Sequence, residues 1–239
     1  QSVLNPDEFD PATIHLSIGY FSPFFTGEPF AIAMISNVNL IGQGEELTIL
    51  DAELTDIVLL MENCQNNIIS DLTITGGYAI NSGGGISIVQ NSNTIISYVN
   101  IMNNVTDGLG GGIQCHGSKP ILYNVTIVNN TSDTTVTNGG GGISITSTYG
   151  EEFISRPILI NTIVWDNSIA QIAFANSSSE IVIAYSALQG SNDINYGIGG
   201  PLNVNEIHWL EENIDADPRF VDPENGDYSL LLNSPCKDT

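Results

Sequence analysis

Three basic side chains are the first candidates for chemistry in this sequence. Lys119 and Arg156 each stand directly before a proline, and His116 lies three residues before Lys119. A polysaccharide lyase needs a base that removes the proton beside a uronic acid carboxylate, and a positive group that binds this carboxylate. Lys119, Arg156 and His116 would therefore be the catalytic residues if the chain were such an enzyme.

The overall charge argues against that chemistry and against nucleic acid. The 239 residues contain 4 Lys and Arg against 27 Asp and Glu, which gives a formal net charge of −23. A strongly acidic protein repels a polyuronate, and four scattered bases cannot form the cationic patch that nucleic acid or an anionic membrane requires. We therefore expect solvated loop ends at Lys119 and Arg156, and no nucleic-acid partner. No apolar run is long enough to cross a bilayer, so we also expect no membrane span.

Acidic residues crowd one segment near the C-terminus. Calcium prefers carboxylate and loop carbonyl oxygens, so this segment is a candidate calcium site. The residue order does not match an EF-hand, and turn formation explains the second half of the segment equally well. Calcium is the one cofactor that the sequence suggests, and its candidate ligands are Asp215, Asp217, Asp222, Glu224 and Asp227.

The cysteines indicate neither a zinc knuckle nor a disulfide framework. There are three of them, Cys64, Cys115 and Cys236, with no C-x-x-C pair. We expect buried thiols that act as small hydrophobic side chains. One disulfide plus a free thiol is the alternative.

The segments that must position these residues repeat along the chain. Ile74, Ile101 and Ile127 occupy matching places in three similar segments, 27 and 26 residues apart. Each segment alternates apolar and polar residues, which is typical of a strand with one buried face. A Gly-Gly-Gly-Ile run follows each of them, and the three runs are Gly83–Ile86, Gly110–Ile113 and Gly140–Ile143.

Short strands at a constant period, each too small to bury its own face, predict a solenoid. A period in the mid-twenties suits one coil of a parallel β-helix, and no stretch shows sustained helical periodicity. Asn104, Asn130 and Asn167 follow the central strand of successive coils. We expect these asparagines to take left-handed φ at a corner and to hydrogen-bond to one another through their amides. The glycine runs predict a second corner, where neighbouring coils approach closely.

One domain of residues 1–239 follows from this pattern. We expect a leader and cap over 1–33, coils over 34–190, and a loop-rich C-terminal cap over 191–239 with a tight turn at Asn225-Gly226.

The sequence resembles a large family of secreted bacterial proteins with right-handed parallel β-helix repeats. The resemblance rests on the Gly-Gly-Gly-Ile corners, on strands of the type N-x-T-I-x-x-N, and on a closing segment from Asp217 to Leu230 followed by Ser234-Pro235-Cys236. It implies an all-β, right-handed, single-stranded parallel β-helix (a β-solenoid) and secretion to the cell exterior or surface. It implies no particular activity.

These observations predict a non-catalytic extracellular or cell-surface protein that acts as an adhesin, a matrix component or a filament subunit. A solenoid has two terminal coils with open backbone edges, so a second copy of the chain is one expected partner, joined end to end. A glycan or another cell-surface molecule is the other expected partner. The alternative function is a carbohydrate-active protein, either a polysaccharide lyase or a glycan-binding module.

Overall fold

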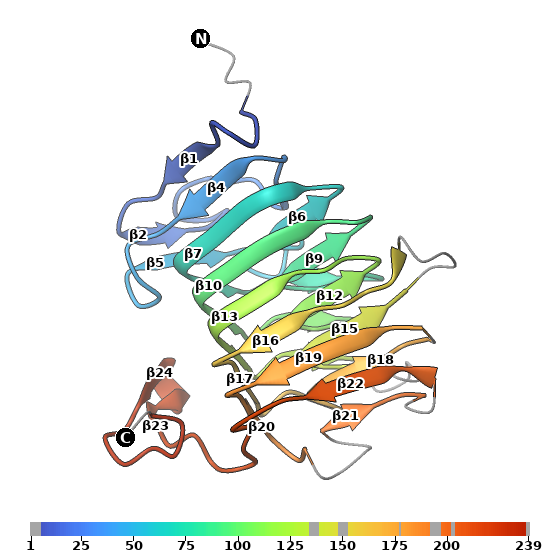
Figure 1. The fold of residues 1–239 in the computed structure, drawn as a ribbon. Coiled ribbons are helices and arrows are strands. Elements are labelled where there is room, and N and C mark those ends of the chain that lie inside the picture. Colours follow the sequence, from blue (N-terminus) through green and yellow to red (C-terminus); the bar gives the residue numbers. More distant parts are fainter. Residues whose placement is uncertain are drawn as a thin grey trace.

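The computed structural model describes residues 6–133, 139–147, 153–176, 178–191, 197–201 and 204–237. In this part of the chain, short strands stack one above the next into a parallel β-solenoid (Figure 1). The predicted fold class is therefore confirmed.

The largest sheet runs along the whole solenoid, with successive strands in parallel. Its main path is β1 (Ala12–His15), β4 (Val38–Ile41), β7 (Gln65–Thr75), β10 (Asn93–Met102), β13 (Ile121–Val128), β16 (Ile158–Ile160), β19 (Glu180–Ala184) and β22 (Glu206–Trp209). Four further strands continue it around a bend: β2 (Gly19–Phe21), β5 (Thr48–Asp51), β17 (Ile163–Trp165) and β20 (Ala187–Leu188).

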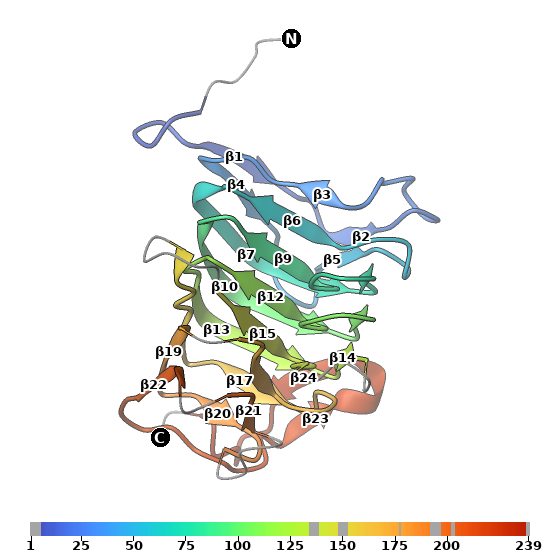
Figure 2. The same cartoon turned by 90° about the vertical axis from the view of Figure 1, so that its right-hand side faces the viewer.

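A second parallel sheet holds one strand from each coil, and its seven strands correspond to seven coils in the described part of the chain (Figure 2). They are β3 (Ile32–Ala33), β6 (Leu59–Glu62), β9 (Ile86–Val89), β12 (Ile113–His116), β15 (Ile143–Thr146), β18 (Ile172–Phe174) and β21 (Ile198–Gly199). A third, short sheet joins β8 (Tyr78–Ala79), β11 (Val105–Thr106) and β14 (Thr131–Ser132).

The sequence period sets the register between coils. Ile74 pairs with Ile101, and Ile101 pairs with Ile127, so equivalent residues stack directly. All three side chains are fully buried in the hydrophobic core, which runs as a column inside the solenoid. Each coil therefore buries its apolar face against copies of itself, as a repeat protein requires.

The predicted asparagine ladder is present. Asn104 Nδ2 donates to Asn130 Oδ1 at 3.0 Å, and Asn130 Nδ2 donates to Asn167 Oδ1 at 3.0 Å. The expectation of left-handed φ at these asparagines is wrong, because that conformation falls on the residue before each of them, as at Asn103 and Asn129 with φ of 54°. The preceding residue turns the chain, which leaves the ladder amide free to point inward.

The glycine runs form the corner where neighbouring coils approach most closely. A Cβ atom at Gly84 would lie 2.3 Å from the carbonyl oxygen of Val105, and one at Gly142 would lie 2.4 Å from that of Gln171. Real Cβ atoms do not approach so closely, so close contact between coils requires glycine here.

The coils extend further at both ends than the predicted 34–190. At the N-terminal end, β1, β2 and β3 pair with β4, β5 and β6, so most of the predicted leader over 1–33 forms a coil. At the C-terminal end, β21 and β22 add another coil within the predicted cap over 191–239, and Ile214 bridges Ala187. The sequence signal of the repeat is weaker in the two terminal coils, because neither of them has a Gly-Gly-Gly-Ile corner.

The chain ends in an antiparallel hairpin that lies beside the solenoid (Figures 1 and 2). It consists of β23 (Phe220–Asp222), the 3₁₀ helix η3 (Pro223–Asn225) and β24 (Asp227–Leu230). Gly226 takes left-handed φ of 84° at the predicted turn. Tyr228 anchors the hairpin, because its Oη accepts a hydrogen bond from Asn129 Nδ2 at 2.6 Å. The hairpin thus lies against the side of the solenoid.

Within the described residues, no helix has the length and apolar character needed to span a membrane.

Candidate functional site

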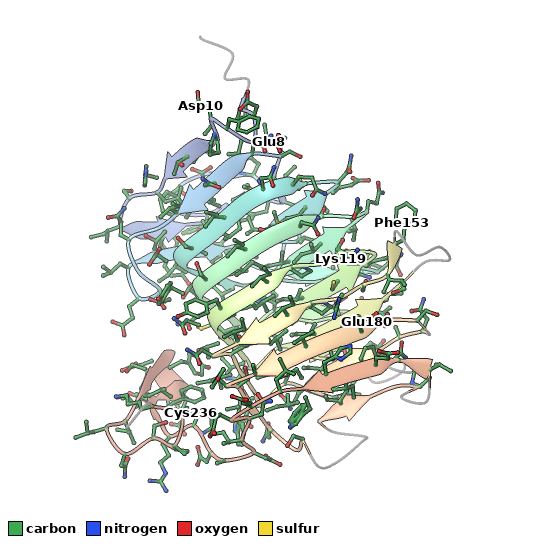
Figure 3. All side chains as sticks on the ribbon, viewed as in Figure 1. Glu8, Asp10, Lys119, Phe153, Glu180 and Cys236 are labelled. Atoms are coloured by element: carbon green, nitrogen blue, oxygen red, sulfur yellow. The ribbon has the colours of Figure 1, made fainter. Side chains whose placement is uncertain are left out.

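Lys119 and Arg156 lie at equivalent positions of neighbouring coils, as their sequence context predicted. The backbone N–H of Lys119 donates to Ser92 O at 3.1 Å, and that of Arg156 donates to Ser118 O at 3.0 Å. Arg156 Nε lies 3.0 Å from Glu180 Oε2, so its charge is already engaged by a carboxylate. Lys119 is exposed on the same face of the solenoid (Figure 3).

His116 lies on a strand of the second sheet, whereas Lys119 and Arg156 lie in the loops before β13 and β16. It ends β12, where it pairs with Val89 and Thr146. Among the described residues, no hydrogen bond or ion pair joins the side chains of His116, Lys119 and Arg156. The three groups therefore do not form a hydrogen-bonded catalytic constellation in this structure.

The carboxylates of the candidate calcium segment make local contacts. Asp217 Oδ1 accepts from the N–H of Arg219 at 2.8 Å, and Asp222 Oδ2 accepts from Asn225 Nδ2 at 2.8 Å. Hydrogen bonds from Ser229 to Asp227 lower the pKa of the Asp227 carboxyl.

The two remaining candidates, Asp215 and Glu224, lie apart from these contacts. Asp215 Oδ1 accepts from the N–H of Gly190 at 3.0 Å, and Glu224 lies in η3. Within the described chain, no three of the five candidate ligands bring donor atoms within 4.8 Å of one another. Calcium binding at this segment stays a prediction.

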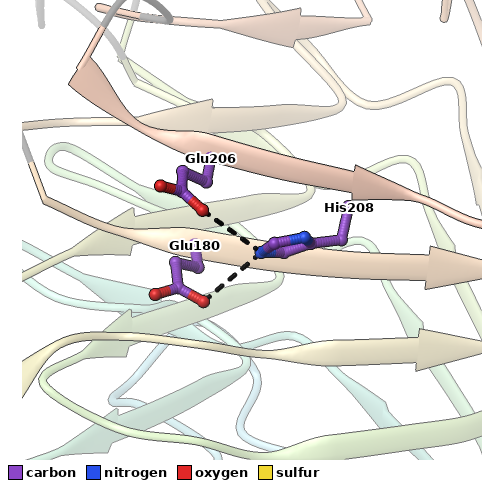
Figure 4. A group of neighbouring side chains, drawn as sticks. All are labelled: Glu180, Glu206 and His208. Atoms are coloured by element: carbon purple, nitrogen blue, oxygen red, sulfur yellow. Dashed lines mark ion pairs between the residues drawn. The ribbon is translucent and has the colours of Figure 1, made fainter.

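A different cluster, which the sequence analysis missed, lies on the outer face of the last two coils (Figure 4). Glu180 on β19 stands directly opposite Glu206 on β22 in the parallel register, and His208 lies two residues further along β22. His208 Nε2 is 3.4 Å from Glu180 Oε2 and 3.6 Å from Glu206 Oε2. The sequence signal would have been the Glu-x-His triplet at 206–208 together with a glutamate one period earlier.

All three cysteines are free thiols. Cys64 and Cys115 are buried, as expected, and Cys236 is partly exposed. Burial raises the pKa of the Cys115 thiol to about 12, because the interior disfavours the thiolate. Cys115 Sγ donates a hydrogen bond to Ser118 O at 3.2 Å. A thiol with these properties is a packing residue and not a nucleophile.

The two ends of the solenoid expose residues that occupy core positions elsewhere. One column of inward-facing side chains runs from the first coil to the last, and its members are Ile14, Leu40, Ile69, Ile96, Leu122, Leu159, Ile183 and Trp209. The six inner members are at most 4% exposed, whereas Ile14 is 50% exposed and Trp209 is 42% exposed. Both terminal side chains lack the neighbouring coil that covers every other member.

The backbone edges at the two ends are open in the same way. β1 pairs only with β4 and β22 pairs only with β19 in the described part of the chain. The C-terminal hairpin does not extend this sheet, because β23 and β24 pair only with each other in the described part of the chain. Each end therefore presents unpaired strand N–H and C=O groups beside exposed apolar side chains.

A crevice of about 590 Å³ separates the C-terminal segment from the side of the solenoid. Asn124 and Asn161 line it from successive coils, and Tyr185 and Glu212 continue the row. Lys237 lines it from the C-terminal segment. Amide, hydroxyl and carboxylate groups thus face one groove.

Comparison with known proteins identifies the repeat. No curated protein gives a significant match to the sequence. A family profile described as a right handed beta helix region matches residues 41–188, which is more than half of the chain. The matched residues contain the glycine corners, the asparagine ladder and the stacked isoleucines described above, and the chain thus belongs to the right-handed β-helix family.

Proposed function

We propose that this protein is a non-catalytic structural subunit outside the cell, which stacks end to end into filaments. The observation that carries the proposal is the exposure of core positions and strand edges at both ends of the solenoid. Secretion is proposed from the resemblance of the closing segment and corners to secreted β-helix proteins.

The two ends are complementary when the parallel register is continued across a junction. If β1 of one copy stacks on β22 of the next, Trp209 covers Ile14 and Ile207 covers Ala12, by extension of the observed pairing. Apolar side chains then meet apolar side chains at both inward-facing positions. This contact removes exposed apolar surface from water, which is favourable by about 25 cal/mol per Å².

The contact joins unlike surfaces, so it does not close on itself. A head-to-tail interface leaves one free end of each kind after every addition, and an assembly built from it grows into an open filament. Strand pairing across the junction also satisfies the edge N–H and C=O groups that a single copy leaves to solvent.

The test uses one substitution at each end, Ile14→Ser and Trp209→Ser. We expect sedimentation and negative-stain microscopy to show that the unaltered chain elongates with rising concentration. Each variant should stay monomeric on its own. Ile80→Ser is the matched control, because Ile80 is 64% exposed and directly follows β8 in the middle coils, so its replacement should leave elongation unchanged.

Mixing the two variants gives the sharpest result. The Ile14→Ser chain keeps an intact C-terminal end, and the Trp209→Ser chain keeps an intact N-terminal end. An equimolar mixture should therefore form dimers that cannot grow. An unaltered chain that stays monomeric at high concentration, or end variants that elongate normally, would overturn the proposal.

Glycan binding is the second candidate, and the crevice beside the C-terminal segment favours it. A groove of about 590 Å³ with amide, hydroxyl and aromatic groups suits a neutral oligosaccharide. Titration with neutral oligosaccharides, compared between the unaltered chain and Asn161→Ala, tests this function. For the lyase form of this alternative, Lys119→Ala should abolish any cleavage of a uronate polymer, and unchanged cleavage would exclude Lys119 as its base.

A further inference from the structure

We propose that Glu180, Glu206 and His208 bind a divalent transition metal ion of the zinc class. This site goes beyond the proposed structural role and does not depend on it. It would hold together the outer face of the last two coils.

The fold brings three donor groups to one place on the surface. Side chains two residues apart on a strand point to the same face, so Glu206 and His208 both face outward from β22. Parallel pairing sets Glu180 directly opposite Glu206 on the adjacent coil. Two strands therefore present two carboxylates and one imidazole side by side (Figure 4).

Two of the three distances between the donor atoms match a tetrahedral site. Zinc bonds to imidazole nitrogen and carboxylate oxygen are about 2.0–2.2 Å long, which places neighbouring ligand atoms of a tetrahedron about 3.3–3.6 Å apart. His208 Nε2 lies 3.4 Å from one carboxylate oxygen and 3.6 Å from the other. All three donor atoms lie within 4.8 Å of one another.

The state of His208 Nε2 is a second observation at this cluster, because the side chain is 37% exposed while Nε2 itself is covered. This atom has less than 1 Å² of exposed surface and no hydrogen-bond partner among the described residues. A buried polar atom without a hydrogen bond is costly and calls for an explanation, such as an ion at the site. The lone pair on Nε2 of a neutral imidazole is a metal ligand. A metal ion between the three groups would satisfy it.

Arg156 contacts the Glu180 carboxylate of this cluster. Its Nε lies 3.0 Å from Glu180 Oε2, the same oxygen that faces His208 Nε2. The guanidinium charge also opposes a cation, so affinity should rise when Arg156 is replaced by glutamine. Two oxygens and one imidazole suit zinc, whereas calcium takes six to eight oxygen ligands.

The test is calorimetric titration with Zn²⁺ on the Ile14→Ser chain, so that any end-to-end assembly does not contribute. We expect one Zn²⁺ per chain at about 0.15 M salt, where nonspecific attraction to the acidic surface is screened. His208→Asn and Glu206→Gln should each weaken binding at least about tenfold. Zinc should also raise the melting temperature of the parent and not of these variants.

Two matched controls distinguish Zn²⁺ binding at this site from nonspecific binding to the acidic surface. His116→Asn makes the same substitution in another sheet, and Glu211→Gln removes one exposed acid from the same coil. Both should bind Zn²⁺ like the parent, and excess Ca²⁺ should not displace it. Zinc binding that survives His208→Asn, or that Ca²⁺ displaces at equal concentration, would overturn the proposal, as would the absence of zinc binding.

Discussion

The side chain of Asn130 makes four hydrogen bonds in the interior of the solenoid. Its Nδ2 donates to Asn167 Oδ1 and to Ile101 O, and its Oδ1 accepts from both the N–H and the Nδ2 of Asn104. The recurrence of asparagine after the central strand predicted this contact. A buried amide of this kind specifies the register between coils, because a shift by one residue would leave its polar atoms unsatisfied.

Replacing Asn130 by alanine should destabilise the protein by about 3 kcal/mol. The substitution leaves the buried backbone and amide groups of the neighbouring coils without partners, at a cost of about 1–3 kcal/mol each. Urea unfolding monitored by circular dichroism measures the change. Asn100→Ala is the control, because Asn100 is only half-buried and should cost less than about 1 kcal/mol. Equal effects at the two positions would contradict this account of the ladder.

The cluster of Glu180, Glu206 and His208 was not predicted, although its spacing follows the repeat. Glu206 stands 26 residues after Glu180, within the period of the earlier coils. The glycine corners that indicate the repeat are absent from the last coil. The sequence therefore predicts a cap there and not a coil. The Glu-x-His triplet one period after Glu180 was the available signal, and only the register of β19 and β22 shows that these residues are neighbours.

At the scale of elements, the C-terminal hairpin is the segment whose position could not be predicted. The sequence correctly indicated a turn at Asn225-Gly226, because Gly226 supplies the left-handed φ that ends η3. Its docking depends on Tyr228, which bonds to Asn129 from 99 residues away and packs its ring edge-on against Phe220 at 5.1 Å. Local sequence carries no signal for such a contact.

Replacing Tyr228 by alanine should release the hairpin from the side of the solenoid. The change removes a buried ring as well as the hydrogen bond to Asn129, so the segment around residues 215–219 should become sensitive to limited proteolysis while the coils keep their circular dichroism spectrum. Tyr228→Phe keeps the ring and should remain largely protected. Unchanged proteolysis of the alanine variant would show that other contacts hold the hairpin.

At the scale of the whole molecule, the net charge of −23 controls how copies approach one another. Asp7, Glu8 and Asp10 lie beside the first coil, and Glu211 and Glu212 lie beside the last, all exposed. Each end therefore carries exposed acidic groups near its apolar residues in the sequence. Apolar contact favours stacking there, and like charge opposes it.

End-to-end assembly should therefore strengthen with ionic strength. Raising the salt from about 0.01 M to about 0.15 M shortens the screening length from about 30 Å to about 8 Å, which weakens the repulsion between the acidic groups of the two ends. Sedimentation at a fixed protein concentration should show longer species at the higher salt. The Trp209→Ser chain should stay monomeric at both salt concentrations. Assembly that weakens with added salt would contradict this prediction and would point to attraction between charged groups.

The period of the sequence was sufficient to predict the strands, their parallel stacking, the asparagine ladder and the glycine corners. In a solenoid, the neighbour of each residue is the residue one period away, so a local pattern already specifies the long-range contact. The exposed ends, the side-docked hairpin, the pairing of Arg156 with Glu180 and the site around His208 depended on the tertiary structure. Each of these arises where the repetition stops or where side chains of unlike type meet across coils, and there periodicity carries no information.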